Sequence, residues 1–415
     1  MKEPTDSNVP QIRFKGFAEE WAEFTLDNLG VATSGTSIES EFKSNGIFKV
    51  ISIGSYAENS TYTDQGIRVD LTNKTRERVL NEGDLTMVLN DKTASGRIIG
   101  RVLLIPTGHA FIYNQRTQRI EPYLDKFLPN FLYQLLNAPL IRLKIINQSQ
   151  GNTQIYVNWS SIKKSIYLLP KLEEQTQIGG YFREVDRLIG LQQRKHDKLV
   201  TLKKAMLHAM FPQPGTTTPE IRFKGFSGEW VEKKLGELCE IVGGGTPSTA
   251  IREYWGGDID WYSPTEIGDE VYASGSVKKI TQVGLTKCSA KMLPPRRTIL
   301  FTSRAGIGDM AILIKEGCTN QGFQSLVLYD DVDPYFMFSM GHLIKCHALK
   351  YASGSTFLEV SSKQLGKMEV LLPNEKEQQK IGTYFRTLDS LISQHAIQLQ
   401  KLKQLKSACL EKMFV

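Results

Sequence analysis

The sequence of 415 residues lacks the features of membrane and secreted proteins. No apolar run approaches the roughly 18–20 residues that a membrane-spanning helix needs. The N-terminal stretch MKEPTDSNVP has none of the apolar core of a signal peptide. No two cysteines form a CxxC pair, so we expect reduced thiols in a cytoplasmic protein at the five scattered positions Cys239, Cys288, Cys318, Cys346 and Cys409.

The familiar motifs of enzymes and metal sites are also missing. GGGTPST (243–249) lacks the lysine of a phosphate-binding loop, and a tight turn after a strand at 238–242 is the better interpretation. DPYF (333–336) has one proline where the (D/N)PP(Y/F) box of methyltransferases has two, so we interpret it as a helix start. His342, Cys346 and His347 have no second pair to complete a zinc site. We therefore predict no catalytic residue, no metal site and no cofactor on this chain.

The sequence instead contains one set of motifs, which we call the frame, and this set occurs twice. PQIRFKGFAEEW (10–21) returns 209 residues later as PEIRFKGFSGEW (219–230), with nine of twelve positions identical. LPKLEEQTQIGGYFREVDRLI (169–189) returns 203 residues later as LPNEKEQQKIGTYFRTLDSLI (372–392). At the same offset, GNTQIYV (151–157) faces GSTFLEV (354–360). The bodies between these motifs are nearly unalignable, so the repeat is a shared frame around two different inserts.

Each body, about 22–165 and 231–367, is rich in short β-type runs separated by glycines, such as VLLIP (102–106) and SLVLY (325–329). Short helices such as FLPNFLYQLLN (127–137) interrupt these runs. The sequence therefore predicts an α+β fold, formed twice. The chain is long enough for two to three domains, each with its own core.

Each repeat ends in a long predicted helix. There is no proline from Glu173 to Phe211, and a helix of roughly 35 residues would be about 50 Å long. Matching seams favour an antiparallel coiled coil with a pseudo-twofold axis; the alternative is that each helix packs on its own body. The 4,3 spacing predicts the seams Leu188, Gln192, Lys195, Leu199, Leu202, Met206 and Ala209, and Leu391, His395, Gln398, Leu402, Leu405, Cys409 and Lys412.

The predicted order of parts is a tail (1–10), a first recognition domain (11–168), a long helix (169–211), a Pro/Gly/Thr-rich linker (212–219), a second recognition domain (220–371) and a second long helix (372–415). Antiparallel helices would relate the two bodies by a rotation of about 180°, as the two strands of duplex DNA are related. Dimeric DNA readers place their two units roughly 34 Å apart, so the helices would serve as a ruler between two reading domains.

A net charge of +7, from 51 Lys and Arg against 44 Asp and Glu, suits a polyanionic partner. Arg and Gln bond bidentately to guanine and adenine edges, and cations beside glycine-rich loops suit phosphates. The loops that hold such residues could equally be ordinary exposed loops. The candidate DNA contacts are Lys92, Arg97, Arg101, Gln115, Arg116, Arg119, Thr153, Gln154, Thr246, Ser248, Tyr254, Arg304, Gln321, Gln324 and Thr356.

Taken together, these motifs resemble the specificity subunit of type I restriction-modification systems. The resemblance is carried by IRFKGF and a later tryptophan at the start of each half, by GGGTPS and YWGGDIDWYSPTEI in the second body, by G-N/S-T before each helix, and by LP…EQ…I…YF…D-x-LI at each helix start. It covers essentially the whole chain. The first body departs from the pattern, with SGTSIES (34–40) where the second has GGGTPST.

The resemblance implies that each body is a target recognition domain that reads one half of a split, asymmetric site on double-stranded DNA. The helices would set the spacer and dock two methyltransferase subunits, which restriction–translocase subunits join. It also implies a non-catalytic chain, with S-adenosylmethionine, ATP and Mg²⁺ on the partner subunits. Two alternatives stay open: a protein scaffold that does not touch DNA, and a recognition module with its own cryptic methyltransferase or nuclease activity. The candidate seam and docking residues are Leu188, Leu199, Leu202, Met206, Leu391, Leu402, Leu405 and Cys409.

Overall fold

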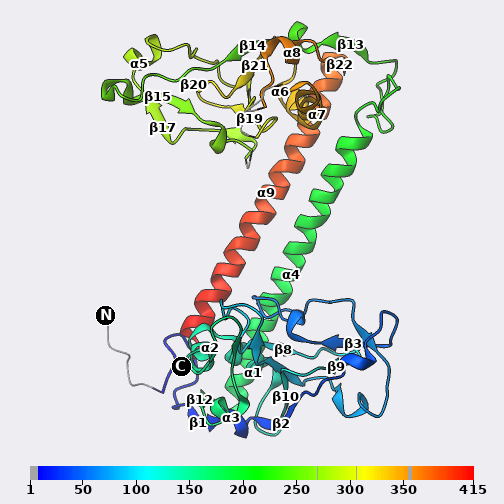
Figure 1. Ribbon diagram of the computed structural model, residues 1–415, viewed down its shortest axis with the longest axis vertical. Coiled ribbons are helices and arrows are strands. Elements are labelled where there is room, and N and C mark those ends of the chain that lie inside the picture. Colours follow the sequence, from blue (N-terminus) through cyan, green and yellow to red (C-terminus); the bar gives the residue numbers. More distant parts are fainter. Residues whose placement is uncertain (1–7, 269, 305, 354–357) are drawn as a thin grey trace. The chain divides into compact units, whose positions relative to one another are not determined.

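The computed structural model describes residues 8–268, 270–304, 306–353 and 358–415, which divide into two units (Figure 1). Unit 1 comprises Met1–Gln193 and Ile397–Val415, and unit 2 comprises Arg194–Ala396. Each unit therefore contains one body, the start of the long helix that follows it, and the end of the other long helix. Among the described residues, no helix has both the length and the apolar character of a membrane span.

Unit 1 contains two four-stranded sheets, in the orders β2-β10-β6-β8 and β4-β3-β9-β5, and the small pairs β1-β12 and β7-β11. Its helices are α1 (Pro129–Asn137), α2 (Pro139–Ile146), α3 (Trp159–Ile162) and the first part of α4 (Leu172–Ala209). Its strands are β1 (Ala22–Thr25), β2 (Gly30–Ser34), β3 (Phe48–Ile51), β4 (Arg68–Val69), β5 (Val79–Leu80), β6 (Leu85–Val88), β7 (Asn90–Asp91), β8 (Val102–Leu104), β9 (Phe111–Tyr113), β10 (Thr117–Pro122), β11 (Ile155–Tyr156) and β12 (Ile166–Leu169).

Unit 2 repeats the first of these sheets in its order β14-β21-β18-β19, which β16 extends, and adds the sheet β17-β15-β20 and the pair β13-β22. Its helices are α5 (Gln282–Thr286), α6 (Pro334–Ser339), α7 (Gly341–Tyr351), α8 (Ser362–Gly366) and the first part of α9 (Glu375–Lys412). Its strands are β13 (Val231–Lys234), β14 (Cys239–Gly243), β15 (Trp255–Tyr262), β16 (Tyr272–Ala273), β17 (Lys278–Ile280), β18 (Thr298–Phe301), β19 (Met310–Leu313), β20 (Gly317–Thr319), β21 (Gln324–Leu328) and β22 (Glu369–Leu372).

The core of each unit lies where two consecutive helices pack on the shared sheet. In unit 1, α1 buries Phe131 and Leu135, which are one helical turn apart, in one cluster with Val102 and Ile120 of the sheet. In unit 2, α6 and α7 occupy the same place in the chain and bury their apolar faces in one cluster with β18 and β21. The predicted α+β class, formed twice, is confirmed.

The two long helices run antiparallel in each unit. In unit 1, the Tyr181 hydroxyl lies 3.4 Å from Cys409 Sγ, and Lys406 Nζ lies 2.7 Å from Asp186 Oδ1. The residue number therefore falls along α9 as it rises along α4. Unit 2 repeats the ion pair 203 residues away, from Lys203 to Asp389 at 2.6 Å.

The buried stripe along each helix differs from the predicted seam at several positions. Leu199, Met206, Leu402 and Cys409 lie on the stripe, and Leu188 is half-buried beside it. Leu202, Leu391 and Leu405 are instead 42%, 38% and 48% exposed, one residue before it. The stripe holds Ile178, Phe182, Val185, Ile189, Gln192, His196, Leu199, Lys203 and Met206 on α4, with Met210 just after its end, and Ile381, Phe385, Leu388, Ile392, His395, Leu399, Leu402, Lys406 and Cys409 on α9, with Met413 just after its end.

The error in the predicted seam has a physical cause. Lys203 and Lys406 occupy stripe positions because each ammonium reaches an aspartate of the antiparallel helix. At these two positions the predicted pattern took the neighbouring leucines, Leu202 and Leu405; at the third, Leu391, the stripe residue is its apolar neighbour Ile392. The lysine stem packs among apolar residues while its charge is neutralised by the carboxylate.

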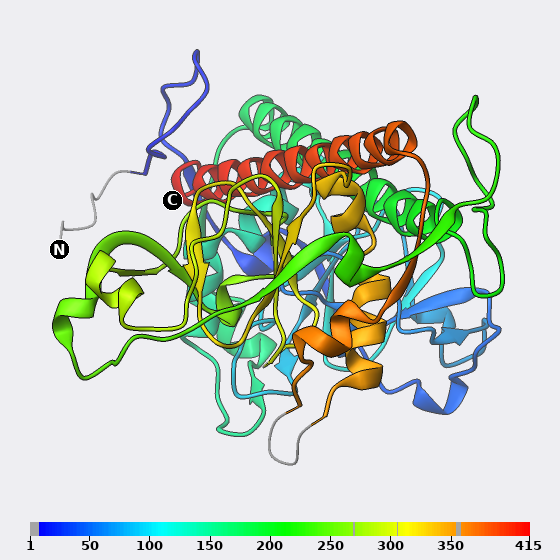
Figure 2. The same ribbon diagram turned by 90° about the horizontal axis from the view of Figure 1, so that it is seen from above.

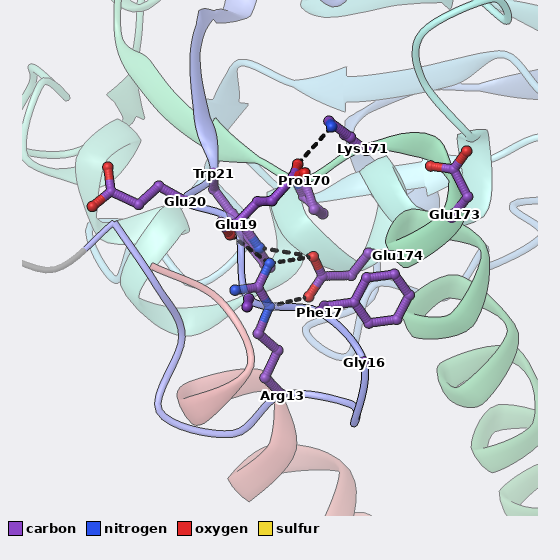
Figure 3. A pocket seen from close by; sticks show the side chains of 11 residues that line it. Arg13, Gly16, Phe17, Glu19, Glu20, Trp21, Pro170, Lys171, Glu173 and Glu174 are labelled. Carbon is purple, nitrogen blue, oxygen red and sulfur yellow. Dashed lines mark hydrogen bonds and ion pairs between the residues drawn. The ribbon is translucent and has the colours of Figure 1, made fainter.

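In each unit, an arginine of the repeated IRFKGF segment pairs with a buried glutamate at the start of the long helix; Figure 3 shows this contact in unit 1. Arg13 donates from Nε and Nη2 to the two carboxylate oxygens of Glu174 at 2.7 and 2.8 Å, and Trp21 Nε1 donates to the same group at 3.2 Å. Arg222 and Glu377 repeat the two-point ion pair at 2.7 Å in unit 2. The glutamates are 2% and 0% exposed, so each needs its arginine to stay charged in the core.

The neighbouring residues of the frame bind two further elements. Ile12 N donates to the carbonyl of Lys412 at 3.0 Å, and in Figure 1 and Figure 2 the blue N-terminal segment accordingly lies beside the red end of α9. Gln175, next to Glu174, accepts from Leu128 N at 3.0 Å just before α1. One short frame therefore joins the start of one long helix, the end of the other and the body of unit 1.

The residues just after the end of each long helix complete a core that also contains the start of the other long helix. Phe414 packs on the rings of Trp21, Phe131 and Phe182, with centroids 5.8–6.4 Å apart. The equivalent side chain in unit 2 is Phe211, which packs on Trp230, Phe336 and Phe385 at 5.5–6.1 Å.

We expect Phe414→Ala to lower the unfolding free energy of unit 1 by about 3–5 kcal/mol, because a buried aromatic ring is removed from a closed core. Amide hydrogen exchange read by peptide should lose protection in unit 1 and keep it in unit 2. Phe211→Ala should give the reverse, and Leu405→Ala, at an exposed position, should change neither by more than about 0.5 kcal/mol. Loss of protection in unit 2 on Phe414→Ala would contradict this division of the cores.

Candidate nucleic-acid interface

Both units bring three loops to the same end of the shared sheet with the same backbone bonds. In unit 1, Leu89 follows β6 and donates from its N to the carbonyl of Arg116, while Val157 N donates to the carbonyl of Leu89, both at 2.9 Å. In unit 2, Ser303 follows β18 and donates to the carbonyl of Gly322 at 2.7 Å, and Val360 N donates to Ser303 at 3.3 Å. The loops differ in sequence, but their anchor points are equivalent.

We call these two sites loop edge 1 and loop edge 2. Loop edge 1 comprises residues 89–101, 114–117 and 150–157. Loop edge 2 comprises residues 302–304, 306–309, 319–323, 353 and 358–360. The G-N-T motif of the first body (151–153) belongs to the third loop of loop edge 1 and is exposed, whereas its counterpart at 354–356 lies outside the described residues.

A fourth segment packs against each edge through a glycine. Gly35 N donates to the carbonyl of Thr117, and Gly245 N donates to the carbonyl of Thr319, each at 2.9 Å. A Cβ on Gly35 would lie 2.0 Å from the carbonyl oxygen of Asn114, and one on Gly244 would lie 1.9 Å from that of Asn320. The glycines after β14 therefore let this segment lie close against the loop, but residues 244–248 form no turn, so the predicted tight turn directly after the strand is not found.

Loop edge 1 gathers most of the candidate contacts predicted in the first body. Lys92, Arg97 and Arg116 are exposed, and Thr153 and Gln154 are exposed beside them. Arg97 meets Glu58 at 3.3 Å, but both side chains are more than half exposed, so the pair holds neither in place. These cations are therefore available to a polyanion.

Gln115 and Arg101 also lie on loop edge 1 but are already bonded. Gln115 Nε2 donates to Glu39 Oε1 at 3.0 Å. Arg101 is half-buried, with Nη1 3.3 Å from Ser60 Oγ, and burial lowers its pKa below the ordinary value for arginine. Either side chain must exchange an internal partner before it can meet a base.

The structure corrects the prediction for Arg119. This residue is on β10 within the sheet, where Nε donates to Asp84 Oδ2 at 2.8 Å and the side chain is 13% exposed. Asp84 is buried, and burial raises the pKa of its carboxyl. Arg119 therefore stabilises the sheet as the partner of a buried acid. The sequence YNQRTQR does not show which arginine points inwards.

The second body brings together fewer of its candidates. Thr246 Oγ1 donates to Gln321 Oε1, so the GGGTPS segment contacts loop edge 2 directly. Arg304 Nη2 lies 2.7 Å from Glu359 Oε2 within the same edge. Gln324 is half-buried at the start of β21, pairing in register with Gly243.

Two further candidates of the second body lie away from loop edge 2, and a third is not described. Ser248 and Tyr254 are next to the β17-β15-β20 sheet, where the Ser248 carbonyl accepts from Trp255 Nε1 at 3.1 Å. Thr356 lies outside the described residues. Among the described residues, loop edge 2 therefore has fewer cations than loop edge 1.

Sequence reasoning missed two buried groups that shape loop edge 1. Asp91 is 4% exposed, and its carboxylate accepts from Thr93 N and Oγ1 at 2.9 and 2.8 Å. Arg142 on α2 is buried and donates to the loop carbonyls of Gly96 and Ile99. A lone arginine in the apolar stretch PLIRLKII was the available signal.

Among the described residues, no group of three His, Cys, Asp or Glu side chains is placed to hold a metal ion. Asp333 of the DPYF stretch begins α6, where its carboxylate accepts from Phe336 N at 2.8 Å, so the predicted helix start is confirmed. The exposed side chains of the loop edges are suited to bind an extended polar ligand through many weak contacts.

The chain matches the family model of the type I restriction modification DNA specificity domain at residues 18–201 and 227–405. It is 34% identical over 194 residues to the type I restriction enzyme MjaIX specificity subunit of Methanocaldococcus jannaschii, over 45% of this chain and 44% of the relative. It is 30% identical over 178 residues to the EcoR124I/EcoR124II specificity subunit of Escherichia coli, over 41% and 43%. These alignments span less than half the length of each relative.

Two solved structures share the fold. The type I restriction-modification S subunit from M. genitalium superposes with a TM-score of 0.65 at 16% identity, over 98% of this chain and 99% of that one. A chain from a study of complex assembly in the type I R-M system gives 0.54 at 19% identity, over 95% and 97%.

We expect Arg119→Met to lower the unfolding free energy of unit 1 by about 3 kcal/mol, because it leaves the buried Asp84 without its cation. Its affinity for duplex DNA, measured on the folded fraction, should match that of the unaltered protein. Arg116→Met, at an exposed loop position, should instead weaken binding to duplex DNA and change the unfolding free energy by no more than about 0.5 kcal/mol. A selective loss of DNA affinity in Arg119→Met would restore it to the interface.

Proposed function

Because the chain belongs to the type I restriction-modification DNA specificity family, we propose that loop edge 1 and loop edge 2 each read one half of a split DNA sequence. The observation that carries this proposal is the repeated backbone anchor, in which Leu89 and Ser303 hold equivalent loops with unrelated side chains. Equivalent backbone anchors would let the two loop edges approach a pseudo-symmetric duplex in the same way. Their different side chains would contact different bases in the two half-sites.

The chemistry of the edges supports contact with both backbone and bases. Lys92 and Arg97 are exposed cations next to small residues, which suits phosphate oxygens. Gln115, Arg116 and Gln321 have the bidentate groups that distinguish purine edges, each worth about 1–3 kcal/mol of discrimination. No step of bond making or breaking is assigned to this chain.

The long helices are suited to hold a fixed spacer and to bind partner subunits. Leu188 and Leu391 are equivalent positions 203 residues apart, as are Leu202 and Leu405, and all four lie beside the buried stripe. Two similar apolar rows suit two copies of one partner. We assign them to two methyltransferase subunits, which restriction–translocase subunits join; S-adenosylmethionine, ATP and Mg²⁺ would act on those partners.

Exchange of residues 26–165 for those of another family member should change one half-site and leave the other unaltered. These bounds keep β1 paired with β12, so the frame stays intact. The matched exchange of residues 235–368, which keeps β13 paired with β22, should change only the other half-site. Modification-sensitive sequencing of DNA from cells that co-express the methyltransferase subunits reads both. A single exchange that altered both half-sites would refute independent reading.

Binding of the assembled complex to duplex DNA should weaken steeply with salt, since each neutralised phosphate contributes about −0.9 to the slope of log affinity against log salt. Lys92→Ala should make this slope shallower by about 0.9 and weaken specific and random duplexes equally. Lys171→Ala, which removes an exposed lysine paired with Glu19 at the frame, should leave the slope unaltered. An unchanged slope in Lys92→Ala would remove Lys92 from the phosphate contacts.

A further inference from the structure

A buried arginine on α2, Arg142, donates hydrogen bonds to the first loop of loop edge 1 (89–101). Arg142 is 9% exposed, and its guanidinium donates to three carbonyls of one loop: Ile99 at 2.8 Å, Gly96 at 3.0 Å and Arg97 at 2.5 Å. These bonds reach backbone atoms, so they depend on the path of the loop and not on its side chains. Removing the guanidinium would leave buried carbonyls without donors.

Two glycines give the loop that Arg142 binds a backbone path that lies close against α2. Gly96 and Gly100 have φ of +62° and +70°, a region that residues with a side chain rarely adopt. Gly100 lies against Ile145, one turn of α2 beyond Arg142, where an added Cβ would meet Ile145 Cγ2 at 2.9 Å. The inner side of the loop is thus fixed on α2, while Lys92 and Arg97 extend to solvent on the outer side.

Unit 2 has a cation at the equivalent position. Lys345 on α7 follows Arg142 by 203 residues, and its Nζ lies 2.9 Å from Asp309 Oδ1 in the first loop of loop edge 2. A Cβ on Gly308 would overlap the Lys345 stem, so this loop also rests on its helix. The pair is 43% and 35% exposed, so it constrains the loop less than the buried bonds of Arg142 do.

We propose that Arg142 is a positioning residue for sequence recognition by unit 1, and that Lys345 has the same role, more weakly, in unit 2. The inference deepens the function proposed above and rests on it. Arg142 is buried and does not meet DNA; it sets where the outer side chains of the loop stand. A misplacement of those side chains by a fraction of a bond length weakens bidentate contacts to bases more than contacts to phosphates, which tolerate adjustment.

Replacement by lysine separates geometry from charge. An arginine offers five donors in a planar fork, whereas a lysine has a single ammonium and cannot reach three separated carbonyls at once. Arg142→Lys should therefore retain part of the loop position, and Arg142→Met should retain none of it. A purely electrostatic role would make lysine equivalent to arginine.

The test compares four variants in the complex that is co-expressed with its methyltransferase subunits. Arg142→Met and Arg142→Lys alter the proposed positioning residue, and Lys345→Met alters its counterpart. Lys144→Met is the matched control, since it removes one cation from the same helix on a face that contacts the Ile166 carbonyl and the Tyr167 ring. The probe is a duplex library randomised separately in each half-site.

Arg142→Met should lower discrimination in the half-site of unit 1 at least tenfold and change that of unit 2 by less than twofold. Arg142→Lys should be intermediate. Lys345→Met should lower discrimination in the half-site of unit 2, but by a smaller factor, and Lys144→Met should alter neither. Full discrimination in Arg142→Met, or an equal loss in both half-sites, would overturn the proposal.

Amide hydrogen exchange of the same variants gives a readout that does not depend on DNA. In Arg142→Met, peptides over 96–101 should exchange at least tenfold faster, while those over β6, β10 and α1 stay protected. General loss of protection in unit 1 of Arg142→Met would mean a merely structural role for Arg142 in that variant. In that case the half-site discrimination and the exchange over 96–101 are compared in Arg142→Lys, which keeps the charge. If the unaltered complex shows no split preference, the proposed function fails while the exchange data still test the loop.

Discussion

The fold depends on a buried carboxylate at the start of each long helix. Glu174 and Glu377 would be unstable in the core as isolated charges, and each is neutralised by an arginine from the repeated IRFKGF segment. That single requirement fixes the segment against the helix start. The residue before the arginine then reaches the end of the antiparallel helix, where Ile12 binds Lys412 in unit 1 and Ile221 binds Ala209 in unit 2. Each frame is therefore a three-way joint, and the identity of its residues follows from what it must join.

Because the frame joins the elements of each unit, the sequences of the two bodies can differ. The frame, the two small strand pairs β1-β12 and β13-β22, and the glutamine after each buried glutamate hold the shared sheet and its helices in place. Beyond those anchors, Lys92, Arg97 and Arg116 of the first body are exposed, so their substitution removes no buried side chain. Under the function proposed above, recognition could therefore change by substitution in the loops while the core remains the same.

Much of this architecture was predictable from the sequence, for reasons that lie in particular residues. The repeat, the two long helices and the α+β bodies follow from identity at a fixed offset and from the absence of proline. The seam was wrong where Lys203 and Lys406 occupy positions that a hydrophobic pattern gives to Leu202 and Leu405. Their aspartate partners come from the other long helix, about 200 residues away in the chain, so no local window reveals them.

The candidate contacts show the same limit. Arg116 and Arg119 stand three residues apart in one polar stretch, yet one is exposed in a left-handed turn and the other is paired with a buried acid. Strand alternation gives the direction of a side chain only once the ends of the strand are known. The support of the loops from α2 and α7 is equally hidden, because Arg142 and Lys345 act on loops that lie more than 30 residues earlier in the chain.

The placement of Phe414 in the core of unit 1 has a consequence for biosynthesis. Residues 194–396 are contiguous, so unit 2 has all of its chain as soon as the ribosome has released that segment. Most of unit 1 precedes unit 2 in the chain, but the ring that packs on Trp21 and Phe182 belongs to Phe414, which follows unit 2. Domains usually complete their folding in the order of their synthesis. In this chain, the core of unit 1 can be completed only after the whole of unit 2 has been synthesised.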